Sequence, residues 1–154
     1  MKKIATLLLF ASLSLIGFTS CSDDEDTQVI QPVEVNHLLG TWKLNTMSLT
    51  SYENGEIVSE YTDLPMSTTM QWDHTFKDDN TVDFIMAIPS AELSQTGSGT
   101  YVKNGNTLTM TIENEAQTFE IKELTSDNLN LKLVEEYEEE GISYKDEIEQ
   151  KFTR

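Results

Sequence analysis

The stretch Leu38-Leu39-Gly40-Thr41-Trp42 divides the chain into two parts of different sequence character. Before it, residues 1–36 hold an apolar segment and an acidic run. After it come only short segments in which apolar and polar residues alternate. Alternation with a period of two is typical of half-buried β-strands and not of helices. We therefore expect this stretch to begin the first strand of an all-β domain that covers residues 37–154.

The alternation after Trp42 predicts about eight to nine short strands. Asn54-Gly55 and Asn104-Gly105 are expected to form tight hairpin turns, because Asn and Gly tolerate positive φ. Residues 90–99 are rich in Ser, Thr and Gly and are expected to form a loop. Strands joined by hairpins, with one wet face, close most simply into an antiparallel up-and-down barrel. A two-sheet β-sandwich is the alternative.

A closed barrel in which all neighbours are antiparallel needs an even number of strands. With nine strands, either one segment lies outside the barrel or the barrel is open at one edge. The weakest segment is Glu56 to Tyr61. The side chains expected inside the barrel share the apolar phase of their strands: Trp42, Leu44, Ile57, Tyr61, Trp72, His74, Phe76, Phe84, Met86, Tyr101, Leu108, Met110, Phe119, Ile121, Leu131, Leu133, Tyr144 and Ile148.

The N-terminus has the parts of a secretory signal: Lys2 and Lys3, followed by a mostly apolar run that is too short to span a membrane comfortably. The run ends in Phe18-Thr19-Ser20-Cys21 and resembles the lipobox of bacterial lipoproteins. The resemblance implies that residues 1–20 are removed and that Cys21, the single cysteine, carries lipid. Phe18 departs from the aliphatic residue usual at that position. The alternative is a secreted protein with one free thiol.

Residues 21–36 are expected to form an acidic tether behind the lipid, the domain's only membrane contact. The run Ser22 to Asp26 resembles the export tag of some Gram-negative outer-membrane lipoproteins. That resemblance implies an outer membrane lipoprotein exposed on the cell surface. The alternative is a plain spacer that holds the domain at the periplasmic face.

The charge balance restricts the partners. The formal net charge is −17, and it becomes −19 without Lys2 and Lys3. Phosphate backbones are bound chiefly by Lys and Arg, so nucleic acid is not an expected partner. The length suits a single folded domain.

Gly40 and Trp42 resemble the Gly-x-Trp signature that opens the first strand of lipocalins. The spacing Trp72-x3-Phe76-x2-Asp79-Asn80-x-Val82 is also similar to a mid-chain hairpin of lipocalin-like lipoproteins from Gram-negative bacteria. The resemblance covers roughly residues 36–154 and implies a lipocalin-like barrel. In secreted lipocalins an arginine on the last strand often covers the tryptophan. Here Lys151 or Arg154 should take that place if the end of the chain closes the barrel floor.

The sequence offers little for catalysis, because a hydrolase needs a positioned nucleophile and base. His37 and His74 are the only histidines, and Cys21 is assigned to lipid attachment. The acidic clusters fall on expected turns or wet faces. We therefore predict no enzymatic activity, no metal site and no cofactor.

Two functions remain open. The first is a membrane-anchored lipocalin-like lipoprotein that binds a small, largely apolar molecule inside the barrel. The second is a surface-displayed structural or interaction protein whose barrel is filled by its own side chains. A cavity below about 300 Å³ would favour the second. The candidate ligand-binding residues are Tyr61, Trp72, His74, Phe84, Tyr101 and Tyr144.

Overall fold

The structure is a computed structural model that describes residues 36–154. The signal segment, Cys21 and the tether to residue 35 lie outside the described residues. The described part contains nine strands and one 3-10 turn, and it has no helix long and apolar enough to cross a membrane. In chain order the elements are β1 (Gly40–Glu53), β2 (Glu56–Pro65), β3 (Gln71–Phe76), β4 (Thr81–Ile88), η1 (Pro89–Ala91), β5 (Leu93–Asn104), β6 (Thr107–Ile112), β7 (Glu115–Leu124), β8 (Asn128–Glu139) and β9 (Ile142–Thr153).

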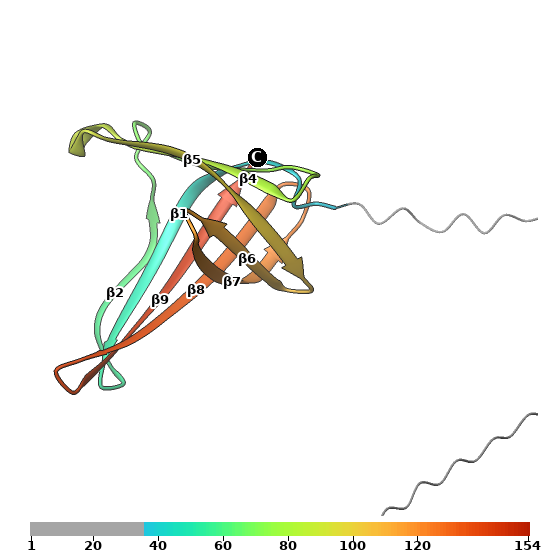
Figure 1. The fold of residues 1–154 in the computed structure, drawn as a ribbon. Helices are drawn as coiled ribbons and strands as arrows, with labels where there is room; N and C mark the ends of the chain where they lie inside the picture. Colours follow the sequence, from blue (N-terminus) through green and yellow to red (C-terminus); the bar gives the residue numbers. More distant parts are fainter. Residues whose placement is uncertain (1–35) are drawn as a thin grey trace, which may run out of the picture. The chain divides into compact units, whose positions relative to one another are not determined.

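The strands form an antiparallel barrel (Figure 1). Each strand from β3 to β9 pairs with the next along the chain, and β9 pairs with β1 to close the wall. The all-β up-and-down barrel expected from the sequence is therefore confirmed. In Figure 1 the long strands β1, β8 and β9 extend away from the barrel on one side of its mouth, and the β4–β5 hairpin extends on the other.

β2 is the strand outside the closed barrel. Along one edge of β1, residues Gly40–Lys43 pair with β3 and residues Thr46–Glu53 pair with β2. Eight strands therefore close the wall. β2 pairs with the part of β1 that extends past the end of β3. The nine strands therefore form an eight-stranded barrel with one strand outside it, and that strand contains Glu56 to Tyr61, the segment expected to be the weakest. The interior positions expected for Ile57 and Tyr61 are wrong, since these side chains are 57% and 51% exposed.

A bulge in β1 changes which residues point inward. The register with β9 shifts between Leu44, which lies opposite Phe152, and Thr46. Successive side chains of a strand alternate between faces, and one extra residue reverses that alternation. Trp42 and Leu44 point into the core before the bulge, and Met47 lies opposite the buried Gln150 after it.

The segment expected to be a loop, residues 90–99, is mostly strand. β5 begins at Leu93, and its two glycines face crowded neighbours. A Cβ on Gly97 would collide with the Phe84 ring, and one on Gly99 would collide with the backbone oxygen of Thr111. The glycines permit the close approach of neighbouring strands, a use of strand glycine that composition alone cannot separate from a flexible loop.

The Asn54-Gly55 turn is confirmed. The second turn lies one residue later than predicted, because Asn104 ends β5 and Gly105 and Asn106 form the connection to β6. Asn54 and Gly55 have φ of 50° and 84°, and Gly105 has φ of 56°. The acidic residues before Gly141 lie mostly in a strand and not in a turn. β8 continues to Glu139, so that only Glu140 and Gly141 connect it to β9.

The closed end of the barrel is built around Trp42, which is fully buried. Its indole Nε1 donates to the backbone oxygen of Leu38 over 2.8 Å. The Arg154 guanidinium lies over the ring, 4.1 Å from its centroid. Nη2 of Arg154 also donates to the backbone oxygens of His37 and Leu39, each over 2.6 Å. The terminal arginine therefore covers the tryptophan, one of the two placements that the resemblance implied. Lys151 instead pairs with Asp63 at 2.7 Å.

Removing the Arg154 side chain should destabilise the fold measurably. The change Arg154→Ala removes two charge-assisted hydrogen bonds and a cation over an aromatic ring, which together should cost about 1–3 kcal/mol for an exposed side chain. Arg154→Lys keeps the charge but loses the planar fork, so it should recover less than half of that loss. Urea unfolding of both variants checks this expectation, and a loss below about 0.3 kcal/mol for Arg154→Ala would contradict it.

Candidate functional site

The barrel interior contains an open cavity of about 330 Å³, which we call the inner cavity. Its wall is mainly apolar, because the inward-facing positions of β3, β4, β6 and β9 carry large side chains. The volume lies at the lower end of the range of about 300–1,000 Å³ typical of ligand pockets. The lining residues are Met47, Trp72, His74, Phe84, Met86, Met110, Ile112, Gln117, Phe119, Leu133, Glu135, Ile148 and Gln150.

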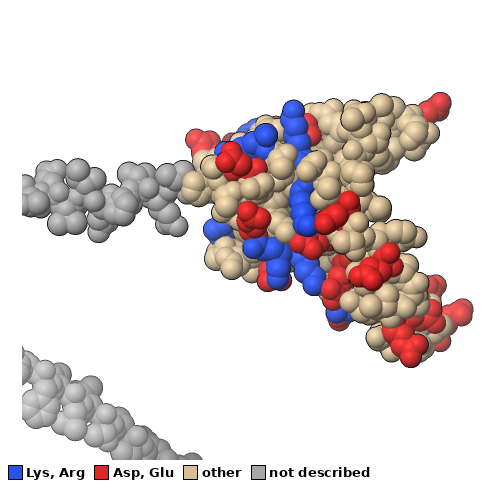
Figure 2. All heavy atoms as spheres, turned by 180° about the vertical axis from the view of Figure 1, so that it is seen from behind, with Lys and Arg blue, Asp and Glu red and all other residues tan. Residues whose placement is uncertain are grey.

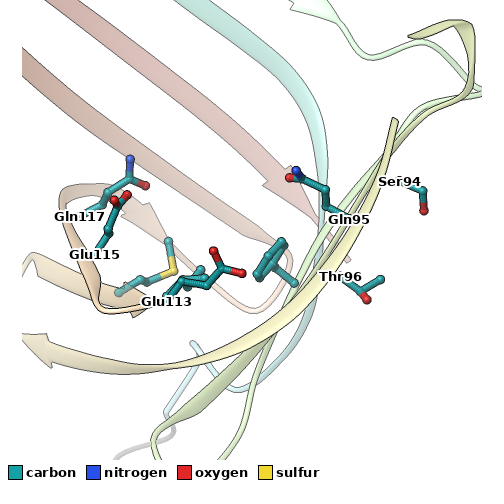
Figure 3. A pocket seen from close by; sticks show the side chains of 9 residues that line it. Ser94, Gln95, Thr96, Glu113, Glu115 and Gln117 are labelled. Carbon is teal, nitrogen blue, oxygen red and sulfur yellow. The ribbon is translucent and has the colours of Figure 1, made fainter. Parts of the chain in front are cut away.

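A second hollow of about 560 Å³ adjoins the inner cavity, and we call it the outer hollow. Phe84, Met110, Ile112 and Gln117 line both spaces. In Figure 3 the labelled Gln95 and Glu113 point into the hollow, whereas Ser94 and Thr96 point to the other side of β5. The outer hollow is polar, and the shared residues place it next to the apolar inner cavity.

The charges around both spaces have one sign. Glu135 lines the inner cavity, and Glu113 and Glu115 line the outer hollow. No Lys or Arg lines either space. Figure 2 shows acidic side chains gathered over the projecting β8–β9 hairpin, whereas the other projection is mostly uncharged. An anion entering the barrel would therefore meet carboxylates and no compensating cation.

His74 is a buried neutral base in the cavity wall. It is 6% exposed, and its Nε2 accepts a hydrogen bond from Nε1 of Trp72 over 3.2 Å. The indole N–H can only donate, so the proton of the neutral imidazole is on Nδ1. Nδ1 is buried and has no hydrogen-bond partner among the described residues. Burial lowers the pKa of His74 from 6.5 to about 4, and the nearby Asp73 carboxylate opposes this only in part.

Gln150 is a functional candidate that the sequence reasoning missed. Its side chain is 8% exposed and lies on the inner cavity wall. Its cross-strand neighbours are Met47 on β1 and Leu131 on β8, which offer the amide no polar side-chain partner. The sequence feature that could have revealed it is its position between Ile148 and Phe152, on the same face of the last strand as these two apolar residues.

Three of the six predicted ligand-binding residues come together. Trp72, His74 and Phe84 all line the inner cavity. The other three lie elsewhere. Tyr101 is buried away from the cavity lining, and its hydroxyl donates to the backbone oxygen of Lys77 over 2.7 Å.

Tyr61 and Tyr144 are the remaining two. Tyr61 pairs with Leu49 on β2, the strand outside the closed wall. Tyr144 stacks on Tyr137 toward the tip of the β8–β9 hairpin, with ring centroids 5.0 Å apart. Neither residue lines the inner cavity. Alternation placed Tyr144 on the same face of β9 as Ile148, but it does not say how far along the barrel axis a residue lies. It also does not show that β2, which carries Tyr61, leaves the closed wall.

Metal-ligating groups do not cluster in the described part of the chain. Within residues 36–154, no group of three or more His, Cys, Asp or Glu side chains is arranged to hold a metal ion. The acidic side chains in and next to the β3–β4 turn are engaged in contacts within that hairpin. Asp79 accepts from the backbone N–H of Thr81 over 3.0 Å, and Asp83 pairs with Lys77 at 2.7 Å.

A closed antiparallel barrel with an apolar interior cavity is the architecture of small-molecule-binding barrels. Residues 38–131 match the family model described as a lipocalin-like domain. The match covers more than half of the chain, and the chain belongs to the lipocalin-like family. No curated protein matches the sequence.

Several solved structures are similar in fold. A lipocalin-like protein from Bacteroides uniformis has 16% sequence identity and a TM-score of 0.47, with 77% of this chain and 98% of that chain covered. An uncharacterized protein from Bacteroides eggerthii has 14% identity and a TM-score of 0.41, with 71% and 98% covered. Bovine odorant binding protein in complex with a selenium-containing odorant has 19% identity and a TM-score of 0.46, with 77% and 70% covered.

Proposed function

We propose that this lipocalin-like protein binds a small, largely apolar molecule in the inner cavity. The observation that carries the proposal is a space of about 330 Å³ with a mainly apolar wall inside a closed barrel. A barrel of eight strands can either be filled by its own side chains or hold one small ligand. Here Trp42 and Phe76 fill the closed end, while Trp72 and Phe84 leave space between them and the opposite wall.

Filling the cavity should abolish binding while a matched outward change should not. Leu133 lines the inner cavity, and its neighbour Val134 is 44% exposed on the outside of β8. We expect Leu133→Trp to weaken binding of the apolar dye N-phenylnaphthylamine by about tenfold or more, because the larger ring occupies the space. Val134→Trp should leave binding within about twofold.

The measurement is the rise in dye fluorescence on titration, together with urea unfolding to show that both variants are folded. Dye binding that is unaffected by Leu133→Trp would place the dye elsewhere. If the unmodified protein binds no apolar probe, the alternative of an interaction protein without a small ligand is favoured.

We further propose that lipid on Cys21 anchors the domain to the outer membrane and that the acidic run after it directs the protein to the cell surface. The support is the lipobox-like Phe18-Thr19-Ser20-Cys21 and the acidic residues that follow. More than one acyl chain is needed for stable attachment.

Removing the acceptor thiol tests the anchor. We expect Cys21→Ser to move the protein from the membrane fraction to the soluble fraction in the native host, with the urea midpoint of the domain unchanged. Retention of the variant in the membrane fraction would show that the anchor is elsewhere. Protease treatment of intact cells separates surface display from the periplasmic face, because only a displayed domain is digested.

A further inference from the structure

The inner cavity has a polar point on an otherwise mainly apolar wall. Gln150 is more than nine-tenths buried as a residue and lies between Met47 and Leu131 across the neighbouring strands. Buried polar groups in folded proteins almost always have hydrogen-bond partners. The inner cavity is where a partner for this amide can be placed, since Gln150 is one of its lining residues.

His74 gives the same wall a second unpartnered group. Its Nε2 is occupied by Trp72, so its Nδ1 carries the proton and has no acceptor among the described residues. Because Nδ1 is covered within the wall, the Gln150 amide is the group that meets a ligand first. Burial keeps the imidazole neutral near pH 7, and so the wall offers hydrogen-bond donors without a positive charge.

The surroundings oppose a negatively charged ligand. The inner cavity and the outer hollow are lined by Glu113, Glu115 and Glu135, and by no Lys or Arg. A carboxylate buried without a cation must either lose its hydration uncompensated or take up a proton. For a ligand carboxyl of ordinary acidity, the cost of protonation at pH 7 is by itself enough to weaken binding by roughly a hundredfold.

We propose that the inner cavity selects uncharged apolar molecules that carry a hydrogen-bonding oxygen, such as a ketone, ester or alcohol, and that the Gln150 amide holds that oxygen. The inference rests on the proposed function, because it names the class of ligand for the same cavity. The amide N–H donates to a carbonyl oxygen of the ligand, and the amide oxygen accepts from a hydroxyl. Carboxylates with the same carbon skeleton are excluded by charge.

The test uses three probes that share the phenylbutane skeleton: butylbenzene, benzylacetone and phenylbutyrate. Butylbenzene carries no polar group, benzylacetone carries a ketone on the third carbon from the ring, and phenylbutyrate carries a carboxylate on the fourth. Calorimetric titration of the full-length protein at pH 7 with each probe gives three dissociation constants. We expect benzylacetone to bind about a hundredfold more tightly than phenylbutyrate. We also expect it to bind at least as tightly as butylbenzene, although benzylacetone is more soluble in water than butylbenzene.

The matched variants are Gln150→Met and Gln71→Met, since Gln150 lines the inner cavity whereas Gln71 is exposed and is not part of its wall. We expect Gln150→Met to lower the affinity for benzylacetone relative to butylbenzene by about tenfold, because the ketone oxygen loses its donor. Gln71→Met should leave that ratio within about twofold. A merely structural role of Gln150 would weaken both probes equally and would leave the ratio unchanged.

The outcomes are distinct. If none of the three probes binds, the proposed function fails and the inference fails with it. If butylbenzene binds but benzylacetone is weaker by tenfold or more, or if phenylbutyrate binds as tightly as the ketone, the apolar cavity stands and the selectivity inference is overturned. The comparison of probes on the unmodified protein decides this even if Gln150→Met does not fold.

Discussion

Trp42→Ala should lower the free energy of unfolding by about 3–5 kcal/mol, as large aromatic deletions in protein cores do. Trp42 is fully buried in the core cluster with Phe76 and Phe152. Its removal leaves a cavity at the closed end of the barrel. It also leaves the Leu38 carbonyl without its donor and the Arg154 guanidinium without the ring beneath it. Trp42→Ala affects all of these contacts at once, so its cost should exceed that of Arg154→Ala.

Urea unfolding measures the effect, and Tyr61→Ala is the matched control. Tyr61 is also a large aromatic side chain, but it is half-exposed on β2. We expect its removal to cost less than about 1 kcal/mol. A loss below about 1 kcal/mol for Trp42→Ala would show that Trp42 does not anchor the core.

The fold should lose roughly 3 kcal/mol of stability as the pH falls from 6.5 to 4, because of His74 alone. The pKa of His74 is lowered to about 4 by burial, from an ordinary value of 6.5. The unfolded chain therefore takes up a proton at a higher pH than the folded protein does. Stability is fully present above pH 6.5 and declines as the pH approaches 4. Each unit of difference corresponds to about 1.4 kcal/mol.

Two single variants isolate this effect. His74→Gln should remove most of the difference in unfolding free energy between pH 7 and pH 4.5, whereas His37→Gln should preserve it, since His37 is exposed. The surface carboxylates titrate alike in all three proteins, so the comparison cancels them. An unchanged pH dependence in His74→Gln would show that the buried imidazole is not the group responsible.

Local sequence patterns predicted the strands well because alternation is a property of neighbouring residues. Trp42 and Leu44, and likewise Leu108 and Met110, share faces as expected and are buried. Asn54-Gly55 turns where positive φ is required. The arginine over Trp42 could be expected only from the resemblance to lipocalins, because residues 42 and 154 are distant in the sequence.

The candidate site was only partly predictable for the same reason. Period-two phasing placed Trp72, His74 and Phe84 inside, and the cavity contains them. It could not separate Tyr101 near the closed end, or Tyr144 toward the hairpin tip, from residues at the cavity. Depth along the barrel depends on the register between strands. Gln150 was overlooked because a single polar residue in an apolar phase has no local signature of burial.

The sequence by itself determined the strands, most of the tight turns and the all-β class, because each depends on contacts or backbone preferences within a few residues. Tertiary structure alone decided that β2 leaves the wall, that a bulge after Leu44 brings Met47 to the inner face, and that Gly97 and Gly99 lie in a strand. It also decided that a cavity remains and that Gln150 lines it. These features depend on pairing between distant strands and on how side chains from all of them fill a shared interior.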